Sequence, residues 1–274
     1  MKYGVVCFVT DQGIAPAVLG RALEERGFDA LFLGEHSHIP ASRRTPVPGG
    51  GDLPEVYYRP FDPFVALSAA ATVTTRLVVG TGVALLTQRD PISTAKEVAS
   101  LDLVSGGRFV FGVGVGWNRE EMENHGTDPT TRGRLMDERL EAMRRIWTED
   151  LAEYHGDFVD FDPIYCWPKP AQKPHPPIYV GGGEASFRRI ARFGAGWLPN
   201  ASPEVLAPQL EKLRDVAGAD VRVTAVYVGP QEPEKLARYE ELGVERVTLR
   251  LPTAPEKETL EHLDRMAGVI AQVG

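Results

Sequence analysis

Three consecutive glycines, beginning at Gly181 and ending at Gly183, lie between an apolar run and a helical one. Glycine lets the backbone approach a ligand closely, and the start of a helix presents free N–H groups and a positive dipole end. Ser186, Arg188 and Arg189 fall in the first turns of that helix. The segment therefore suits a phosphate group, but it suits a tight turn before a helix equally well, and its spacing leaves both interpretations open.

Two histidines, His36 and His38, follow an earlier apolar run. A His-x-His pair at the end of a barrel strand can hold zinc when other strand ends supply further ligands. The runs at 178–180, 196–198 and 246–251 are not followed by the His or Asp that such a site needs. Because histidine titrates near neutral pH, His36 is a candidate proton donor or acceptor beside a cofactor. A loop histidine with no chemical role is the alternative.

The glycine-rich segment 112–116, with Gly114 at its centre, allows a flat ligand or a neighbouring strand to come close. Ligand approach and the packing of small residues inside a barrel are both open there. Trp117 either forms a pocket wall or packs in the core. We assign Trp117 and Asn118, together with His38, to a substrate pocket.

Charged residues near these segments have less distinctive patterns. Arg89 follows the third apolar run and either holds an anion or is solvated, with solvation favoured. Glu120, Glu121 and Glu123 have the spacing of a solvated helix face.

The elements that position these residues alternate along the whole chain. Predicted strands cover 4–9, 30–33, 77–81, 109–114, 178–180, 196–198, 221–228 and 246–251. Predicted helices cover 15–26, segments opening at 62–63 and 90–91, 134–147, 185–193, a segment opening at 203, 233–242 and 255–271. The strands are almost continuously apolar, which is typical of a parallel sheet buried on both faces. Eight such units predict an α/β fold, a (β/α)8 TIM barrel with its active site at the C-terminal strand ends.

We expect residues 1–274 to form one domain, with an irregular insertion at about 148–176 that contains two short strands, 153–154 and 158–159. The formal net charge is −8 and no run of Lys or Arg forms a stripe, so neither nucleic acid nor a membrane is an expected partner. The start of the chain lacks the pattern of a signal peptide, and two cysteines are too few for a disulfide framework. We therefore expect a cytoplasmic protein.

Taken together and in this order, the motifs resemble the luciferase-like monooxygenase superfamily, most closely its coenzyme F420-dependent oxidoreductase branch. The resemblance covers roughly residues 1–200. It is carried by Leu33 to His36, Val79 to Val83 with Asp90-Pro91, Leu101 to Phe109, Gly112 to Trp117, and Pro177 to Gly183. The combination of Ser-Gly-Gly-Arg before a strand and Gly-x-Gly-x-Gly at its end is the most specific part.

The resemblance implies an enzyme that binds coenzyme F420, or alternatively FMN, and transfers a hydride to or from a small organic substrate. It implies a catalytic pair, Glu35 and His36, and a cis peptide bond between Gly82 and Val83 that props the ring. The cofactor-binding residues it implies are Thr81, Gly82, Val83, Gly114, Gly181, Gly182, Gly183 and Ser186. It also implies a homodimer.

This chain has Trp117 where the sugar-phosphate dehydrogenases of that branch have a glutamate, so oxidation of a sugar phosphate is not expected. Three alternatives remain. They are an FMN-dependent monooxygenase supplied by a separate flavin reductase, a metal-dependent hydrolase on the same barrel, and a flavin-binding member without catalysis.

Overall fold

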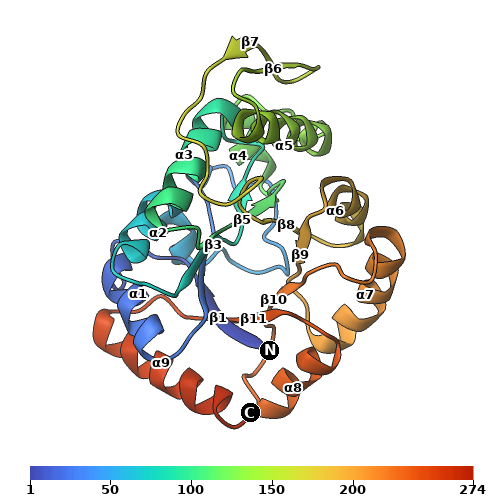
Figure 1. The fold of residues 1–274 in the computed structure, drawn as a ribbon. Helices are drawn as coiled ribbons and strands as arrows, with labels where there is room; N and C mark the ends of the chain where they lie inside the picture. The colour runs from blue at the N-terminus through green and yellow to red at the C-terminus, as the bar shows by residue number, and fades with distance from the viewer. Residues whose placement is uncertain (274) are drawn as a thin grey trace.

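The structure is a computed structural model that describes residues 1–273. Parallel strands form a nearly closed barrel with helices outside it (Figure 1), which confirms the predicted (β/α)8 fold. In order around the barrel the strands are β1 (Lys2–Cys7), β2 (Ala30–Leu33), β3 (Val78–Thr81), β5 (Phe109–Gly114), β8 (Ile178–Gly181), β9 (Gly196–Leu198), β10 (Thr224–Val226) and β11 (Arg246–Arg250). A short strand, β4 (Ala84–Leu85), pairs with β5. Strands β9 and β10 meet through isolated bridges that bring the barrel close to closure.

The outer layer consists of helices that follow the strands. They are α1 (Pro16–Glu25), α2 (Pro63–Ala71), α3 (Pro91–Val104), α5 (Arg132–Thr148), α6 (Phe187–Phe193), α7 (Pro203–Ala217), α8 (Pro233–Glu241) and α9 (Glu256–Ile270). Short helical turns lie at η1 (Glu55–Tyr58), α4 (Arg119–Asn124) and η2 (Glu184–Ser186).

The two Asp-Pro pairs begin helices as predicted. The Asp62 carboxylate accepts from the backbone N–H of Phe64 at 2.9 Å, and that of Asp90 accepts from the N–H of Ser93 at 2.8 Å. Each carboxylate therefore satisfies an amide that the first turn leaves free, while proline occupies the position where no amide donor is needed.

The insertion at 148–176 contains an antiparallel hairpin, β6 (Ala152–His155) and β7 (Asp160–Ile164), which lies at the top of Figure 1 beyond α5. The second strand was predicted at 158–159, and that position was wrong. The backbone N–H groups of these two residues donate to the Glu138 carboxylate, at 2.7 and 3.1 Å, and so belong to the turn.

Strand β10 is shorter than the predicted 221–228. A strand extends only as far as its neighbours pair with it, and the adjacent β9 has three residues. Val223, just before β10, pairs with Trp197 through an isolated bridge.

The apolar core has two parts, as a sheet buried on both faces requires. The larger part lies between strands and helices. The smaller part fills the barrel interior and consists of Ala30, Phe32, Val110, Tyr179, Leu198 and Val226, with Val6, Val78 and Val83 packed against it. Because side chains fill the barrel itself, a ligand can enter only at its mouth.

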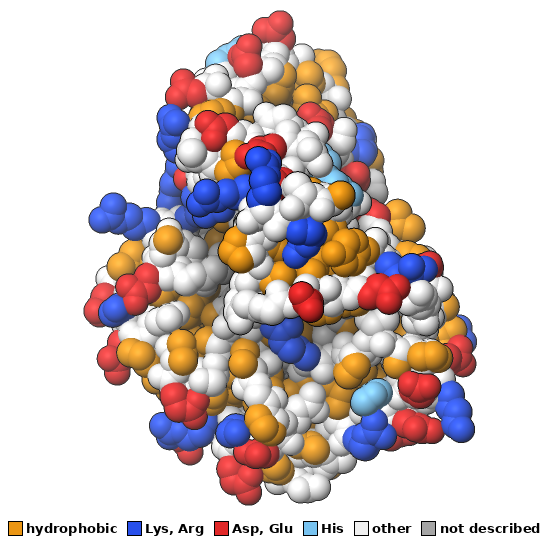
Figure 2. Space-filling view, turned by 180° about the vertical axis from the view of Figure 1, so that it is seen from behind, with side chains coloured by type: hydrophobic (Ala, Val, Ile, Leu, Met, Phe, Trp, Pro, Cys, Tyr) orange, Lys and Arg blue, Asp and Glu red, His pale blue; other side chains and the backbone are white. Residues whose placement is uncertain are grey.

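Acidic and basic side chains are mixed over the face in Figure 2. None of the helices in residues 1–273 combines the length and apolar character needed to cross a membrane.

Candidate active site

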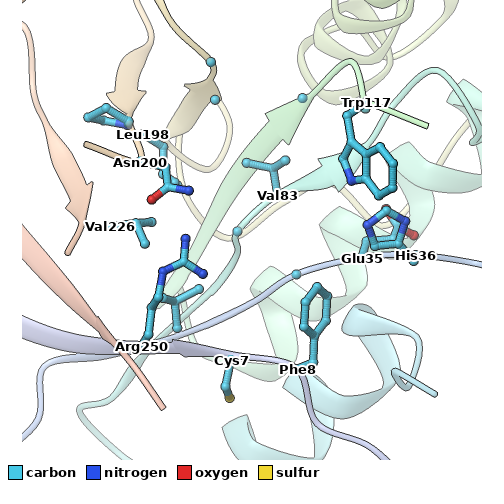
Figure 3. A pocket seen from close by; sticks show the side chains of 18 of the residues that line it. Cys7, Phe8, Glu35, His36, Val83, Trp117, Leu198, Asn200, Val226 and Arg250 are labelled. Carbon is cyan, nitrogen blue, oxygen red and sulfur yellow. The ribbon is translucent and has the colours of Figure 1, made fainter. Parts of the chain in front are cut away.

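A cavity of about 820 Å³ opens where the C-terminal ends of the strands meet, the position of active sites in such barrels. Figure 3 shows His36 and Trp117 on one side of it and Arg250 and Asn200 on the other, with Val83 between them. The predicted site residues that line the cavity are Glu35, His36, Gly82, Val83, Gly114, Trp117, Gly181, Gly182 and Gly183.

His36 forms a buried pair with Glu121. Its Nδ1 lies 2.8 Å from Glu121 Oε2, while the backbone N–H of Ser37 donates to Glu121 Oε1 at 3.1 Å. Because a carboxylate accepts, Nδ1 is the ring nitrogen that carries the proton. Within residues 1–273, Nε2 has no hydrogen-bond partner, and it is not sealed inside the protein. The pair therefore leaves the lone pair of Nε2 available for proton transfer in the cavity.

Three aromatic rings surround the His36 imidazole. The ring centroids of Phe8, Tyr57 and Trp117 lie 6.2, 5.3 and 5.7 Å from that of His36. They limit the access of water to the His36 side chain, which is 5% exposed. An apolar surrounding of this kind strengthens the interaction between His36 and Glu121.

The prediction that Glu120, Glu121 and Glu123 form a solvated helix face was wrong for the first two. Glu121 is fully buried and Glu120 is 4% exposed. The short helix α4 packs against the loop after β2, so that the Thr45 backbone N–H donates to Glu120 at 2.8 Å. Burial alone would raise the pKa of Glu120, but its hydrogen bonds with Thr45 and the charge of Arg44 lower it to about 2. The carboxylate therefore anchors the loop that carries His36.

Glu35 lies beside His36 but is held in an ion-pair network. Its Oε2 accepts from the backbone N–H of Leu85 at 2.6 Å, and its Oε1 accepts from Arg89 Nε at 2.6 Å. Arg89 also reaches Asp62 at 2.5 Å and Glu97 at 2.8 Å. Burial would lower the pKa of Arg89, but Glu35 and Asp62 raise it above its ordinary value. Both oxygens of Glu35 are thus engaged by protein donors, whereas Nε2 of His36 is not.

The same network corrects the interpretation of Arg89. We predicted a solvated side chain or a ligand for an exogenous anion, and the structure shows neither. Three carboxylates of this chain already surround the guanidinium.

Thr81 and Ser186, both predicted to contact the cofactor, do not line the cavity. Thr81 is fully buried and its hydroxyl donates to the Gly112 carbonyl at 2.6 Å. The Ser186 hydroxyl donates to the Gly183 carbonyl at 2.7 Å. Each hydroxyl is therefore used to hold a strand end or loop in place.

His38 and Asn118, predicted in the substrate pocket, also lie outside the cavity lining. His38 is hydrogen-bonded to Ser37 Oγ at 2.9 Å and to Asn124 Nδ2 at 2.8 Å. Asn118 is 2% exposed, because its position at the start of α4 turns it into the protein.

Val83 forms an apolar shelf in the middle of the cavity. The Gly82–Val83 peptide bond is cis, as the resemblance implied. A Cβ added at Gly114 would lie 2.7 Å from Val83 Cγ2, and one at Gly181 would lie 3.1 Å from Val83 Cγ1. A side chain at Gly114 would therefore displace Val83, and one at Gly181 would press against it.

The neighbouring glycine loop is open. Gly182 has a φ of 111°, which L side chains rarely adopt, and a Cβ at Gly183 would meet no atom within 4 Å. A flat apolar ring would thus rest on the Val83 side chain, while a phosphate along this loop would encounter backbone rather than side chains.

A metal site is not formed by the two histidines, which have separate partners. Within the described chain, no group of three or more His, Cys, Asp or Glu side chains is placed to hold a metal ion. The alternative of a metal-dependent hydrolase is therefore not supported.

Sequence reasoning missed three residues of this site: Glu121, Asn200 and Arg250. Glu121 is 85 residues from His36, and no local pattern connects them. The sequence did contain an indication of Arg250. Polar residues occupy every second position of an otherwise apolar strand, at Arg246, Thr248 and Arg250, which predicts that they share one face.

The sequence is similar to a known protein family and to several individual proteins. The model of the luciferase-like monooxygenase family matches residues 11–249. An uncharacterized protein of Mycobacterium tuberculosis is 42% identical over 281 residues, covering 99% of each chain. The FMNH2-dependent dimethylsulfone monooxygenase of Pseudomonas putida is 33% identical over 135 residues, which are 47% of this chain and 37% of that protein.

Solved structures share the fold. Monooxygenase RslO1 from Streptomyces bottropensis has a TM-score of 0.81 at 21% identity, covering 99% of both chains. An F420-dependent secondary alcohol dehydrogenase in complex with an F420-acetone adduct has a TM-score of 0.76 at 18% identity, covering 100% of both. Because the family model matches residues 11–249 and the mycobacterial relative is 42% identical over 99% of the chain, this protein belongs to the luciferase-like monooxygenase family.

Proposed function

We propose that this protein is a coenzyme F420-dependent oxidoreductase that transfers a hydride between the deazaflavin and a small organic substrate. The observation that carries the proposal is the arrangement of His36 beside the Val83 shelf. The available Nε2 of His36 and a flat apolar surface line the same cavity. Hydride transfer at a carbinol or carbonyl carbon needs both, because a proton must move at the oxygen while the hydride moves at the carbon.

The residues present fit the cofactor. Val83, backed by Gly114 and Gly181, offers its apolar face to the ring, and the open loop from Gly181 to Gly183 offers backbone to the phosphate of the tail. When bound, the deazaflavin supplies the site that accepts or donates the hydride.

The protein's own part is positioning and proton transfer. When an alcohol is oxidised, His36 Nε2 takes the hydroxyl proton as the carbon gives up its hydride. When a carbonyl is reduced, the protonated imidazole of His36 gives a proton to the carbonyl oxygen. Glu121 keeps the proton of Nδ1 in place and stabilises the imidazolium, as a carboxylate does behind a catalytic histidine. The rings of Phe8, Tyr57 and Trp117 keep competing water away.

Fluorescence titration of the purified protein tests the choice of cofactor. We expect F420 to bind at least tenfold more tightly than FMN, a difference of about 1.4 kcal/mol. Equal or reversed affinities would favour the second candidate, an FMN-dependent monooxygenase supplied by a separate reductase. The FMNH2 dependence of the Pseudomonas putida relative supports that candidate, because the same shelf suits a flavin ring.

The role of His36 is tested separately. His36→Asn should lower turnover by about 10²–10⁴-fold with little change in cofactor affinity. His38→Asn is the matched control, because His38 does not line the cavity and its loss should change turnover far less. Equal losses in both variants, or no loss in His36→Asn, would remove the proton-transfer role.

A further inference from the structure

Strand β11 places a polar face inside the barrel. Val247 and Leu249 are fully buried in the outer core, whereas Arg246 and Thr248, which alternate with them, are buried on the other face. Arg250 continues that inner face by one further step. It pairs in register with Val6, which lines the cavity, and Figure 3 shows its side chain rising into the cavity.

Two other arginines near the barrel, Arg246 and Arg89, are paired with carboxylates. Arg246 Nε lies 2.6 Å from Asp29 Oδ2, and Arg89 is surrounded by Glu35, Asp62 and Glu97. Among residues 1–273, Arg250 has no carboxylate within 4.0 Å, and its guanidinium donates to no protein acceptor. Arg250 is exposed and lines the cavity, which therefore holds a cation that has no counter-ion among the residues that the structure describes.

Two amides accompany this cation. Asn200, after β9, and Gln209, on α7, line the same cavity, and no side-chain hydrogen bond engages either of them in the part of the chain that the structure describes. The lining contributed by β9, β10, β11 and α7 includes no Asp or Glu. One guanidinium, two amides and no carboxylate make a donor set for an anionic oxygen group.

We propose that Arg250, Asn200 and Gln209 form an anion-binding subsite that holds the carboxylate or phosphate of an anionic substrate. The inference rests on the proposed function, because it places the reacting carbon of that substrate between the subsite and His36, against the cofactor ring that the Val83 shelf supports. A short hydroxy acid or phosphorylated alcohol has the required form. Its carbinol carbon gives a hydride to the bound deazaflavin, its hydroxyl proton goes to His36, and the product is the corresponding oxo compound.

Binding measurements on the F420-loaded protein test the subsite without turnover. The probes are lactate, inorganic phosphate and lactamide, the last being a neutral match for lactate. We expect calorimetry to show lactate binding at least tenfold more tightly than lactamide. Arg250→Gln should remove this preference and weaken phosphate binding at least tenfold, whereas Arg250→Lys should retain part of both. Arg21→Gln, which removes the same charge from an exposed position on α1, should bind all three probes as the wild type does.

Titration of F420 into the same variants shows whether Arg250 binds an anionic substrate or the anionic part of the cofactor. We expect F420 affinity to stay within about twofold in Arg250→Gln. A large loss of F420 affinity with unchanged probe binding would assign Arg250 to the anionic part of the cofactor and overturn the proposal. Failure of the wild type to prefer the anions, or equal behaviour of Arg250→Gln and Arg21→Gln, would also overturn it. If F420 itself fails to bind the wild type, the proposed function fails, and the anion preference is then measured on the cofactor-free protein.

Discussion

The buried carboxylate of Glu121 provides the sharpest test of the His36 site. Glu121→Gln keeps the shape of the side chain and removes its charge. The carboxylate accepts two hydrogen bonds, from His36 Nδ1 at 2.8 Å and from the Ser37 backbone at 3.1 Å. The amide has one oxygen, so it can accept from only one of these donors and must present its N–H₂ to the other. The backbone N–H cannot reverse its role, but the imidazole can.

The expected loss of turnover depends on the tautomer that His36 adopts in Glu121→Gln. If His36 keeps its proton on Nδ1, the loss is the difference between a hydrogen bond to a charged group and a neutral one, about 1–1.5 kcal/mol, or roughly tenfold in rate. If the imidazole changes tautomer, its proton moves to Nε2 and the base in the cavity is lost, which costs about 10²–10⁴-fold. The Ser37 contact favours the second outcome, because the amide oxygen then satisfies the fixed backbone donor.

The assay combines turnover with the nitrogen chemical shifts of His36, which report the tautomer without substrate. Glu123→Gln is the matched control, since Glu123 lies on the same short helix, is exposed and carries the same charge. We expect it to match the wild type in both measurements. A Glu121→Gln protein that keeps wild-type turnover and Nδ1 protonation would refute the assignment of Glu121 as the residue that positions His36.

Three further predictions address the surrounding structure. Thr81→Val should reduce the free energy of unfolding by about 1–2 kcal/mol, because the Gly112 carbonyl loses its donor, while F420 affinity stays constant; a selective loss of affinity would restore Thr81 to the cofactor site. Gly114→Ala should weaken F420 at least tenfold with little loss of stability, because the new Cβ displaces the Val83 side chain; unchanged affinity in titration would remove the ring from that shelf. Burial alone would raise the pKa of Glu24, but backbone N–H groups lower it from 4.5 to about 2. Its contribution to stability is therefore present above pH 4.5 and lost as the pH falls through about 2. Denaturation of Glu24→Gln should accordingly show a deficit in the free energy of unfolding at pH 7 that is mostly gone at pH 2, and a deficit equal at both pH values would contradict this.

The sequence determined the barrel because its signals are local. Near-continuous apolar runs alternating with helical ones specify parallel strands buried on both faces, and the Asp-Pro pairs at 62–63 and 90–91 specify where two helices begin. The same rule that places active sites at C-terminal strand ends located His36, Trp117 and the glycine loop in the cavity. The placement of Val83 came from the family resemblance, since no physical rule predicts a cis bond there.

Tertiary structure alone decided what each polar group at the strand ends touches. Glu35 and Glu121 are both acidic residues near His36. Glu35 is paired with Arg89, however, whereas Glu121 is hydrogen-bonded to the His36 imidazole. Nothing in their own neighbourhoods distinguishes these roles, because the distinguishing partners lie tens of residues away along the chain. The lack of a carboxylate partner for Arg250 among residues 1–273 has the same cause, because only the closure of the barrel decides which carboxylates reach it. Local periodicity therefore specifies the fold, whereas the pairing of charges depends on contacts between strand ends that only folding brings together.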